Sequence, residues 1–552
     1  MIRKRLKEIL DQCFNDGVVQ GLWSAEADGG YSVEAPRQAS HGDYATNMAM
    51  VIAGREKKNP REIAARLVGM VAKHDELISR AEIAGPGFVN FVINPRVWQA
   101  VLPEVCRQNE KFGLSEEGKG RKVMVEFVSA NPTGPLSVGH GRQAVLGDAI
   151  ARLLSATGHV VTREYYYNDA GRQMRVLGES TRARYLEQLG LESEFPEDGY
   201  QGEYIREIAD SMIRESGDSL KDVTDFTPFK EKAEQAIFAD INGTLTRLGI
   251  KFDNYFNEHT LYDDGLIDDV VATLRNKGLV YDQDGAVWFK TTEFGHDQDR
   301  VIIKSTGEPT YRLPDIAYHR EKFRRGFDWM VNIFGSDHIA TVPDVLAGVE
   351  ALGYDPQKVT VVLHQFVTLM REGKQVKMST RKANFITVDE LVDEVGVDVV
   401  RFFFLMRKAD SQLEFDLDLA TQQSQENPVY YMQYGHARLA SINKKAVEKG
   451  VERGDIDGAD LQLLVEPEEL ALLKSMAGWP ELVRSAAMDL EPHRVIFYMQ
   501  DLAAQFHSYY NKHRILSEDL ELSKARLWLA EGLKIILRNG LHLIGVGAPE
   551  SM

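Results

Sequence analysis

Residues 123–154 read VMVEFVSANPTGPLSVGHGRQAVLGDAIARLL, and this stretch decides the fold. An apolar run over 123–128 leads into a loop that is dense in proline and glycine. A helical pattern then begins near Val138 and continues to about Ser155. A strand, a tight loop and a helix start are the arrangement by which a chain presents backbone N–H groups to a phosphate. The stretch therefore predicts a βα unit that binds a phosphate group.

The composition excludes several classes of protein. The chain has 552 residues and a net charge of −18, so it is a poor non-specific binder of nucleic acid, and an RNA partner would need a local cluster of basic side chains. Its two cysteines, Cys13 and Cys106, lie far apart, which argues against a disulfide framework and a cysteine-ligated zinc site. We find no apolar run long enough to span a membrane and no signal-peptide pattern at the start. A cytoplasmic protein is expected.

The pattern around the opening stretch is an alternation of short apolar strands and amphipathic helices. This alternation predicts an α/β domain with a Rossmann-type, doubly wound parallel sheet. The expected strands are 122–128, 160–167, 329–334 and 359–363, and the expected helices between them include 138–155 and about 340–352.

The remaining segments predict further domains. We expect an N-terminal α+β domain over 1–112, in which 44–62 forms a helix, a break and a helix, and 81–93 forms a strand, a turn and a strand. The catalytic domain is expected over 121–390, with an insertion at about 190–300, followed by a connecting segment over 391–426. Helical periodicity alone marks the last part of the chain and predicts an all-α helical bundle over 427–552, from the segments 427–449, 466–488, 491–513 and 520–543.

Gly139, His140, Gly141 and Arg142 stand at the head of the predicted helix. The glycines allow the backbone to approach a ligand closely, and a helix N-terminus favours an anion. His140 is placed to donate a hydrogen bond to a phosphate, with help from Arg142. The alternative is a tight turn that carries a surface histidine.

A second cationic stretch, 372-EGKQVKMSTRKANF-385, follows the strand expected at 359–363. A solvated basic loop is the plain alternative. Loops at the carboxyl ends of parallel strands form the ligand crevice, however, and a run of cations there in an acidic protein is better explained by a polyanionic ligand.

Together the two motifs resemble the paired signatures of class I aminoacyl-tRNA synthetases. The surrounding residues resemble the arginyl-tRNA synthetases of the bacterial type, in SANPTGPL at 129–136, YNDAGRQ at 167–173, GSDH at 335–338 and NPVYYMQYGHAR at 427–438. The residues HGDYATN at 41–47 resemble that family's additional N-terminal domain. The resemblance runs in order along the whole chain.

The resemblance implies a reaction and its partners. Arginine and ATP would form arginyl-adenylate and pyrophosphate, and the arginyl group would pass to the terminal adenosine ribose of the tRNA for arginine. The family implies that tRNA must be bound for activation, that Mg²⁺ accompanies ATP without a dedicated protein cage, and that the enzyme is a monomer.

The family's ATP site maps onto two groups of residues in this chain. Ser137, Gly139, His140 and Arg142 would hold ATP from one side, and Lys377, Met378, Ser379 and Arg381 would close from the other, with His338 at the ribose; His140, Lys377 and Ser137 are the expected catalytic residues. Two positions depart from the family pattern. Ser137 stands where relatives carry a histidine, and Thr380 replaces a lysine, so that Arg381 or Lys382 would substitute.

Recognition of arginine calls for carboxylates, because a planar guanidinium pairs best with them bidentately. By the resemblance, Glu126 and Asn131 would face the amino-acid end of the substrate, and Tyr311, Asp315 and Asp337 would line the rest of its site. Glu126 in an apolar strand is costly unless it is paired, which favours a functional role. For Asp315 and Asp337, capping of a following helix is a rival explanation, and for Tyr311 ordinary packing is the rival.

The expected tRNA contacts are Asn47 in the N-terminal domain and Tyr434, Arg438, Tyr509 and Lys512 in the helical domain. Aromatic residues interleaved with bases suit stacking on unpaired nucleotides. The alternative is that several of these aromatics belong to the core of the bundle.

Two other functions compete with an arginyl-tRNA synthetase. A nucleotidyltransferase with a small-molecule acceptor would share the sheet, although it has no need of the long helical domain. A catalytically retired, tRNA-binding paralogue would explain the departures at Ser137 and Thr380.

Overall fold

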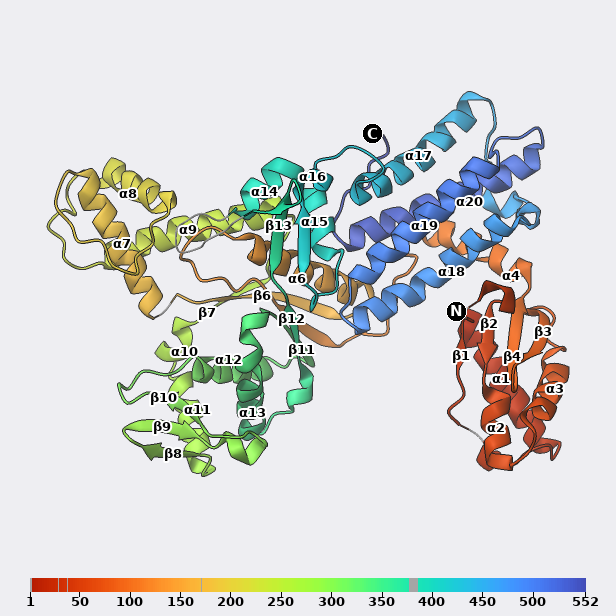
Figure 1. The fold of residues 1–552 in the computed structure, drawn as a ribbon, viewed down its shortest axis with the longest axis horizontal. Helices are drawn as coiled ribbons and strands as arrows, with labels where there is room; N and C mark the ends of the chain where they lie inside the picture. Colours follow the sequence, from red (N-terminus) through yellow and green to blue (C-terminus); the bar gives the residue numbers. More distant parts are fainter. Residues whose placement is uncertain (1, 28, 37, 170, 377–385) are drawn as a thin grey trace.

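The fold is built around one parallel sheet, with an α+β unit before it and a helical bundle after it (Figure 1). The structure is a computed structural model and describes residues 2–27, 29–36, 38–169, 171–376 and 386–552. The predicted fold class is confirmed. None of the helices in these ranges is both long and apolar enough to cross a lipid bilayer.

The central sheet has the order β12-β11-β5-β6-β7, and every neighbouring pair is parallel. Its strands are β5 (Lys122–Glu126), β6 (Val160–Tyr167), β7 (Asn254–Asn257), β11 (Trp329–Gly335) and β12 (Val359–His364). The chain moves outward from β5 through β6 to β7 and then returns to the other side of β5. A parallel sheet binds its ligands where this direction reverses, which here is between the carboxyl ends of β5 and β11.

Helices cover both faces of this sheet. On one face α6 (Val138–Ala156) packs on the side chains of Val123 and Val125. On the other face α12 (Arg312–Arg324) and α13 (Val342–Leu352) cover Met124 and Met330 through Phe323 and Leu346. The alternation of β5 side chains between the two faces places Glu126 on the α12 side, together with Met124.

The packing of α6 on the sheet depends on one glycine. A Cβ at Gly147 would lie 2.2 Å from the ring of Phe127, so only glycine allows the helix to lie this close.

The expected insertion at about 190–300 needs a correction, because an edge strand of the central sheet lies within it. The β7 strand pairs with β6, and it separates two excursions from the sheet. The first contains α7 (Arg172–Gln188), α8 (Glu203–Ser216) and α9 (Thr227–Arg247), which extend away from the sheet in Figure 1. The second contains α10 (His259–Asp263), α11 (Leu266–Asn276) and an antiparallel sheet of β8 (Val280–Gln283), β9 (Ala286–Phe289) and β10 (Arg300–Ile303).

A small second sheet follows β12. It has the order β14-β13-β15, from β13 (Val367–Arg371), β14 (Lys374–Gln375) and β15 (Leu413–Asp416). Between β14 and β15 lie α14 (Val388–Val395) and α15 (Val397–Leu405). The cationic loop therefore follows β14 and not β12 directly.

The N-terminal unit packs helices α1 (Ile2–Val19), α2 (Met48–Glu56) and α3 (Pro60–Val71) on an antiparallel sheet. Its strands are β1 (Val33–Glu34), β2 (Tyr44–Thr46), β3 (Ile78–Ala84) and β4 (Phe88–Ile93). The helix expected to start at Tyr44 is wrong over 44–46, because these residues pair with β4. Long-range pairing overrides the local helical pattern here, and the helix begins only at Met48.

The C-terminal bundle consists of α17 (Pro428–Glu448), α18 (Pro467–Met488), α19 (His493–Lys512) and α20 (Leu520–Leu543). It is joined to the central domain by Arg401 of α15. The guanidinium of this fully buried residue binds the Asp148 carboxylate on α6 and donates to the carbonyl of Ile544, which follows α20.

Candidate functional site

The chain leaves β5 through a strained turn. Val128 and Ser129 have φ values of 65° and 41°, a left-handed conformation that is unfavourable for a β-branched residue. The expected strand over 122–128 therefore ends at Glu126. The turn brings the Ser129 hydroxyl to 3.2 Å from Oε1 of Glu126. The hydroxyl oxygen of Ser129 in turn accepts the backbone N–H of Tyr166 at 3.1 Å. Strain at this point holds Glu126 and the following loop in one position.

The start of α6 orients His140. Its Nδ1 accepts the backbone N–H of Ser137 at 3.3 Å, and the Ser137 hydroxyl lies 3.2 Å from the same nitrogen. Because Nδ1 is occupied as an acceptor, the proton of the neutral ring belongs on Nε2, where it can be donated to a ligand. Burial lowers the pKa of His140, which keeps the ring neutral. Ser137 thus holds the histidine in place.

The two glycines beside His140 have different environments. A Cβ at Gly139 would meet only the Ser137 hydroxyl, at 3.8 Å, so the backbone of the first turn is open on this side. A Cβ at Gly141 would lie 2.8 Å from the Val388 side chain. Gly139 therefore leaves room for a ligand, whereas Gly141 is required for packing.

The expectation that Arg142 binds ATP needs correction. Its side chain is buried, and the guanidinium donates to the backbone carbonyls of Gln365 at 2.7 Å and Lys408 at 3.0 Å. Arg142 joins α6 to the segments after β12 and α15. A sequence motif cannot show that an arginine beside a glycine pair points into the protein.

Three carboxylates converge at the carboxyl edge of the sheet on the side that faces α12. Glu126 ends β5, Glu258 directly follows β7, and Asp315 lies in the first turn of α12. Both glutamates raise the pKa of Asp315 through their negative charge, and the same three acids act on the Tyr166 hydroxyl. In the described part of the chain, Lys322 is the one cation that acts on Asp315.

Asp315 is the most perturbed of these acids. Burial and the neighbouring glutamates raise its pKa to about 7, whereas an exposed aspartate titrates near 3.8. Asp315 is not a helix cap, because α12 begins three residues earlier at Arg312. A partly buried carboxylate beside two other acids favours a cationic ligand.

Glu126 is paired inside the protein. It is 3% exposed and forms an ion pair with the ammonium of Lys322, which is 0% exposed. Lys322 also donates to Asn332 Oδ1 at 2.9 Å. The ion pair with Lys322 therefore compensates for the burial of Glu126 without a ligand. Burial alone no longer argues that Glu126 contacts a substrate.

The other expected residues of this edge lie around its opening. Tyr311 is 79% exposed and is not packed in the core. Asn131 donates a hydrogen bond to Gln173 on α7. Asp337 and His338 lie in the turn after β11, with His338 Nε2 3.8 Å from the Asp337 carboxylate and its ring 5.2 Å from that of Phe334. Asp337 is exposed and is not the residue that caps the turn.

The cationic loop, with Lys377, Met378, Ser379, Thr380, Arg381 and Lys382, lies outside the described residues. Its described neighbours are close to His140. Thr387 forms an antiparallel bridge with Ser137, and the N–H of Val388 donates to the carbonyl of Leu136 at 2.9 Å. The segment that follows the loop thus runs beside the start of α6.

Some of the residues expected to contact tRNA are exposed, and others already form hydrogen bonds or ion pairs within the fold. The guanidinium carbon of Arg438 lies 5.7 Å from the centre of the Tyr434 ring and 4.3 Å from that of Tyr510. These partly exposed side chains of α17 and α19 form one surface cluster. Lys512 is exposed and pairs with Glu468 at 2.6 Å. The Asn47 side chain accepts the backbone N–H of Ser32 at 2.7 Å, so its amide oxygen is already used within the fold.

Tyr509 needs a correction. It is only 1% exposed, and its hydroxyl lies 3.2 Å from Glu469 in the interior of the bundle. Tyr509 lies three residues before Lys512 on α19, but its side chain belongs to the core of the bundle.

Sequence reasoning missed Glu258 and Lys322. Glu258 follows an edge strand that was taken as part of an insertion, and Lys322 lies among several charged residues of α12. Recognition of β7 as a strand of the central sheet would have placed Glu258 at the ligand-binding edge.

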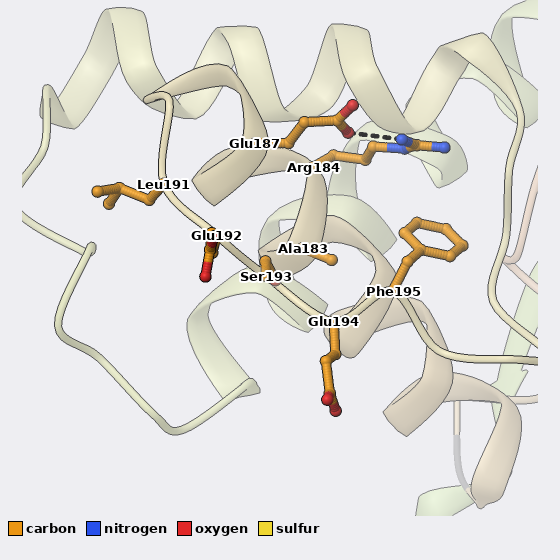
Figure 2. A pocket seen from close by; sticks show the side chains of 8 residues that line it. All are labelled: Ala183, Arg184, Glu187, Leu191, Glu192, Ser193, Glu194 and Phe195. Atoms are coloured by element: carbon orange, nitrogen blue, oxygen red, sulfur yellow. Dashed lines mark hydrogen bonds and ion pairs between the residues drawn. The ribbon is translucent and has the colours of Figure 1, made fainter.

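Other features of the structure do not compete with this edge. A hollow of about 640 Å³ between α7 and the loop after it is lined by acids and by Arg184, which pairs with Glu187 (Figure 2). It lies on the excursion that extends away from the sheet (Figure 1). Among the described residues, the one group of side chains spaced to hold a metal ion is Glu466, Glu468 and His513 in the helical bundle.

Three protein-family profiles match the chain. The profile of the arginyl tRNA synthetase N terminal domain covers residues 1–93, that of the catalytic domain of class I (R) tRNA synthetases covers 102–401, and that of the DALR anticodon binding domain covers 432–552.

Full-length relatives are similar along the entire sequence. The chain is 65% identical to the arginine–tRNA ligase of Desulfotalea psychrophila over 552 residues, covering all of both chains, and 48% identical to that of Syntrophotalea carbinolica, covering 100% of this chain and 99% of the relative. The arginyl-tRNA synthetase structure from Thermus thermophilus superposes with a TM-score of 0.76 at 23% identity and 100% coverage of both, which supports the fold.

The raised pKa of Asp315 predicts a pH-dependent effect of its replacement. The folded protein holds a proton on Asp315 up to about pH 7, whereas the unfolded chain loses it near pH 3.8, so ionisation of this group lowers stability as pH rises between these values. Asp315→Asn should therefore stabilise the protein more at pH 8 than at pH 5.5, by more than about 1 kcal/mol in the free energy of unfolding. Thermal denaturation at both pH values measures the difference. The matched control is Asp337→Asn, at an exposed position on the same edge. A difference between Asp315→Asn and the parent that does not grow with pH would contradict the assignment.

Proposed function

The chain belongs to the arginyl-tRNA synthetases, the class I ligases that join arginine to its tRNA with the use of ATP, and from this premise we propose how its described residues hold the substrates. The activity is that of an arginine–tRNA ligase, with ATP, arginine and tRNA as its partners. This activity replaces the competing hypothesis of a nucleotidyltransferase with a small-molecule acceptor.

One observation carries the proposed arginine site, namely the convergence of Glu126, Glu258 and Asp315 around Lys322. When all three acids are ionised, the ammonium of Lys322 leaves two negative charges without a partner in this cluster. Arginine brings two cationic groups, its guanidinium and its α-ammonium group, besides its own carboxylate. Its two cationic groups therefore match the two acids that Lys322 leaves without a partner, while its carboxylate is directed to ATP.

The positions of the acids give each a role. Asp315 and Glu258 bind the guanidinium, for which paired carboxylates are the best partners. Glu126 faces the α-ammonium group, and Asn131 the carboxylate end of the substrate. The exposed ring of Tyr311 at the opening covers the bound side chain, and Asp337 lines the same opening.

The ATP site lies at the start of α6. The open backbone of Gly139 and the Nε2–H of His140 donate to the phosphates, and Ser137 holds the ring in this tautomer. Lys377, Met378, Ser379 and Arg381 are assigned to the same phosphates from the sequence motif. They lie outside the described residues, and the described segment that follows them pairs with Ser137 at Thr387. His338 reaches the ribose from the turn after β11.

Activation needs alignment and charge stabilisation and does not need a base. The arginine carboxylate is already ionised and attacks the α-phosphorus, a P–O bond forms, and pyrophosphate leaves with the electron pair of the broken bond. In the transfer step the terminal ribose hydroxyl of tRNA attacks the adenylate carbonyl, the carbonyl C–O bond to AMP breaks, and the hydroxyl proton passes to the phosphate of the departing AMP. Donors such as His140 and Lys377 stabilise the charge that builds on the phosphates.

The remaining partners are assigned from chemistry. Mg²⁺ arrives with the ATP phosphates, because this cation keeps several waters and is usually bound through substrate phosphates. Tyr434, Arg438 and Lys512 offer an exposed surface for unpaired tRNA nucleotides, and Asn47 marks the N-terminal contact. The enzyme acts as a monomer in the cytoplasm, with domains over 1–112, 121–390 and 427–552.

Replacement of Glu258 tests the proposed arginine site. Glu258→Gln should raise the KM for arginine by about tenfold or more, because the guanidinium loses one of two charged partners, while the KM for ATP stays within about twofold. Arginine-dependent ATP–pyrophosphate exchange, with tRNA present, measures both constants.

The control for this experiment is Glu234→Gln, which removes an acid that accepts the Tyr167 hydroxyl at 3.0 Å but does not face the carboxylate cluster. If Glu258→Gln and Glu234→Gln have the same KM for arginine as the parent, the proposed site is wrong.

Replacement of His140 tests the ATP site. His140→Ala should lower the rate of adenylate formation by about 10²-fold, as expected when a donor to the developing charge is lost. Ser137→Ala, which keeps the backbone N–H that holds Nδ1, should lose far less. Single-turnover activation measures the chemical step in both variants, and an unchanged rate in His140→Ala would remove the residue from the site.

A further inference from the structure

A directed chain of hydrogen bonds lies beneath the proposed arginine site. Lys322 on α12 pairs with Glu126 and donates to Asn332 Oδ1 of β11 at 2.9 Å. The Asn332 amide donates to His319 Nε2 at 2.8 Å, and His319 Nδ1–H donates to the backbone carbonyl of Asp315 at 2.8 Å. The polarity is consistent at each step, because each group donates in the direction of Asp315.

Every member of this chain is shielded from water. Lys322, Asn332 and His319 are all buried, and Lys322 lies 4.1 Å from the centre of the Tyr318 ring. Burial lowers the pKa of His319 to about 3, so its ring remains neutral and keeps one donor and one acceptor nitrogen. A buried polar network with all members satisfied specifies one geometry.

The two ends of the network are the two ends of the proposed substrate site. Glu126 at the end of β5 faces the α-ammonium group, and Asp315 in the first turn of α12 faces the guanidinium. We infer that Lys322 is a positioning residue for arginine: it fixes the Glu126 carboxylate directly and, together with His319, it binds Asn332 of β11 and so holds α12, which carries Asp315, against the sheet. This inference rests on the proposed arginine site, since it concerns the distance between the two carboxylates that bind the substrate.

Lys322 also sets the charge of the site. Without its ammonium the three acids would face the two cationic groups of arginine with an excess of negative charge, and Glu126 would be a buried carboxylate without a partner among the described cations. With it, Glu126 is held in place and still has its second oxygen directed to Ser129 and the opening of the site. Lys322 does not touch the reacting atoms.

A second ion pair, at the end of α12, provides a control that distinguishes a loss of arginine positioning from a loss of stability. Arg325 follows α12 directly and pairs with the buried Glu164 of β6, 2.6 Å from its carboxylate. This pair also joins the end of α12 to the sheet through a buried carboxylate, but it has no hydrogen bond to Asp315 or Glu126. Arg325→Met should therefore lower the Tm without a selective effect on arginine.

The test compares Lys322→Met, Asn332→Leu and Arg325→Met in tRNA-dependent ATP–pyrophosphate exchange, with the Tm of each variant measured alongside. We expect Lys322→Met and Asn332→Leu to raise the KM for arginine by about tenfold or more, with the KM for ATP within about twofold of the parent. Arg325→Met should leave both KM values near those of the parent. Asn332→Leu keeps the Lys322–Glu126 pair, so it carries the test if Lys322→Met does not fold.

Two outcomes would overturn the inference. One is a lower Tm in Lys322→Met and Asn332→Leu with an unchanged KM for arginine, and the other is a rise of both KM values that Arg325→Met reproduces. The proposed arginine site is judged separately by Glu258→Gln. If that variant raises the KM for arginine and neither Lys322→Met nor Asn332→Leu does, the site stands and the positioning role of Lys322 is wrong.

Discussion

Three carboxylates share the interior of one site with a single ammonium group among the described residues, and the catalytic domain is arranged around this imbalance. Glu126, Glu258 and Asp315 come from β5, the end of β7 and α12, and they meet only because the parallel sheet places those carboxyl ends on one edge. Apolar packing from both faces keeps water out and so strengthens the interaction with any cation that enters. In the arginine site proposed here, this demand for positive charge is met by the guanidinium and the α-ammonium group.

The phosphate site proposed at the start of α6 lies after the same strand, and a turn of the backbone separates it from the proposed arginine site. The strained turn at Val128 and Ser129 redirects the chain from the arginine side of β5 to the loop that leads into α6. Ser137 then caps and orients His140 at the helix start. The backbone N–H of Ser137 occupies Nδ1 of His140, a bond that does not depend on the side chain at position 137, and this leaves Nε2 available as a donor.

Local patterns along the chain predicted four of the five strands of the central sheet and the helices of the bundle, because each follows from periodicity or from residues adjacent in sequence. They did not predict which side chains point inward. Arg142 and Tyr509 are buried, and Tyr44 belongs to a strand, since tertiary pairing decides each case. Glu258 and Lys322 were missed for the same reason. Glu258 follows an edge strand within an apparent insertion, Lys322 lies on a charged helix, and each faces acids that other elements of the fold supply.

Calorimetric titration of the free enzyme with arginine, in two buffers of different ionisation enthalpy near pH 7, tests the charge balance of the site most directly. Asp315 holds a proton in the free site because its pKa is about 7, and a bound guanidinium stabilises the carboxylate. The account predicts that arginine binding releases protons and that Asp315→Asn abolishes this release. Binding of arginine without proton release, or an equal release in the variant, would contradict it.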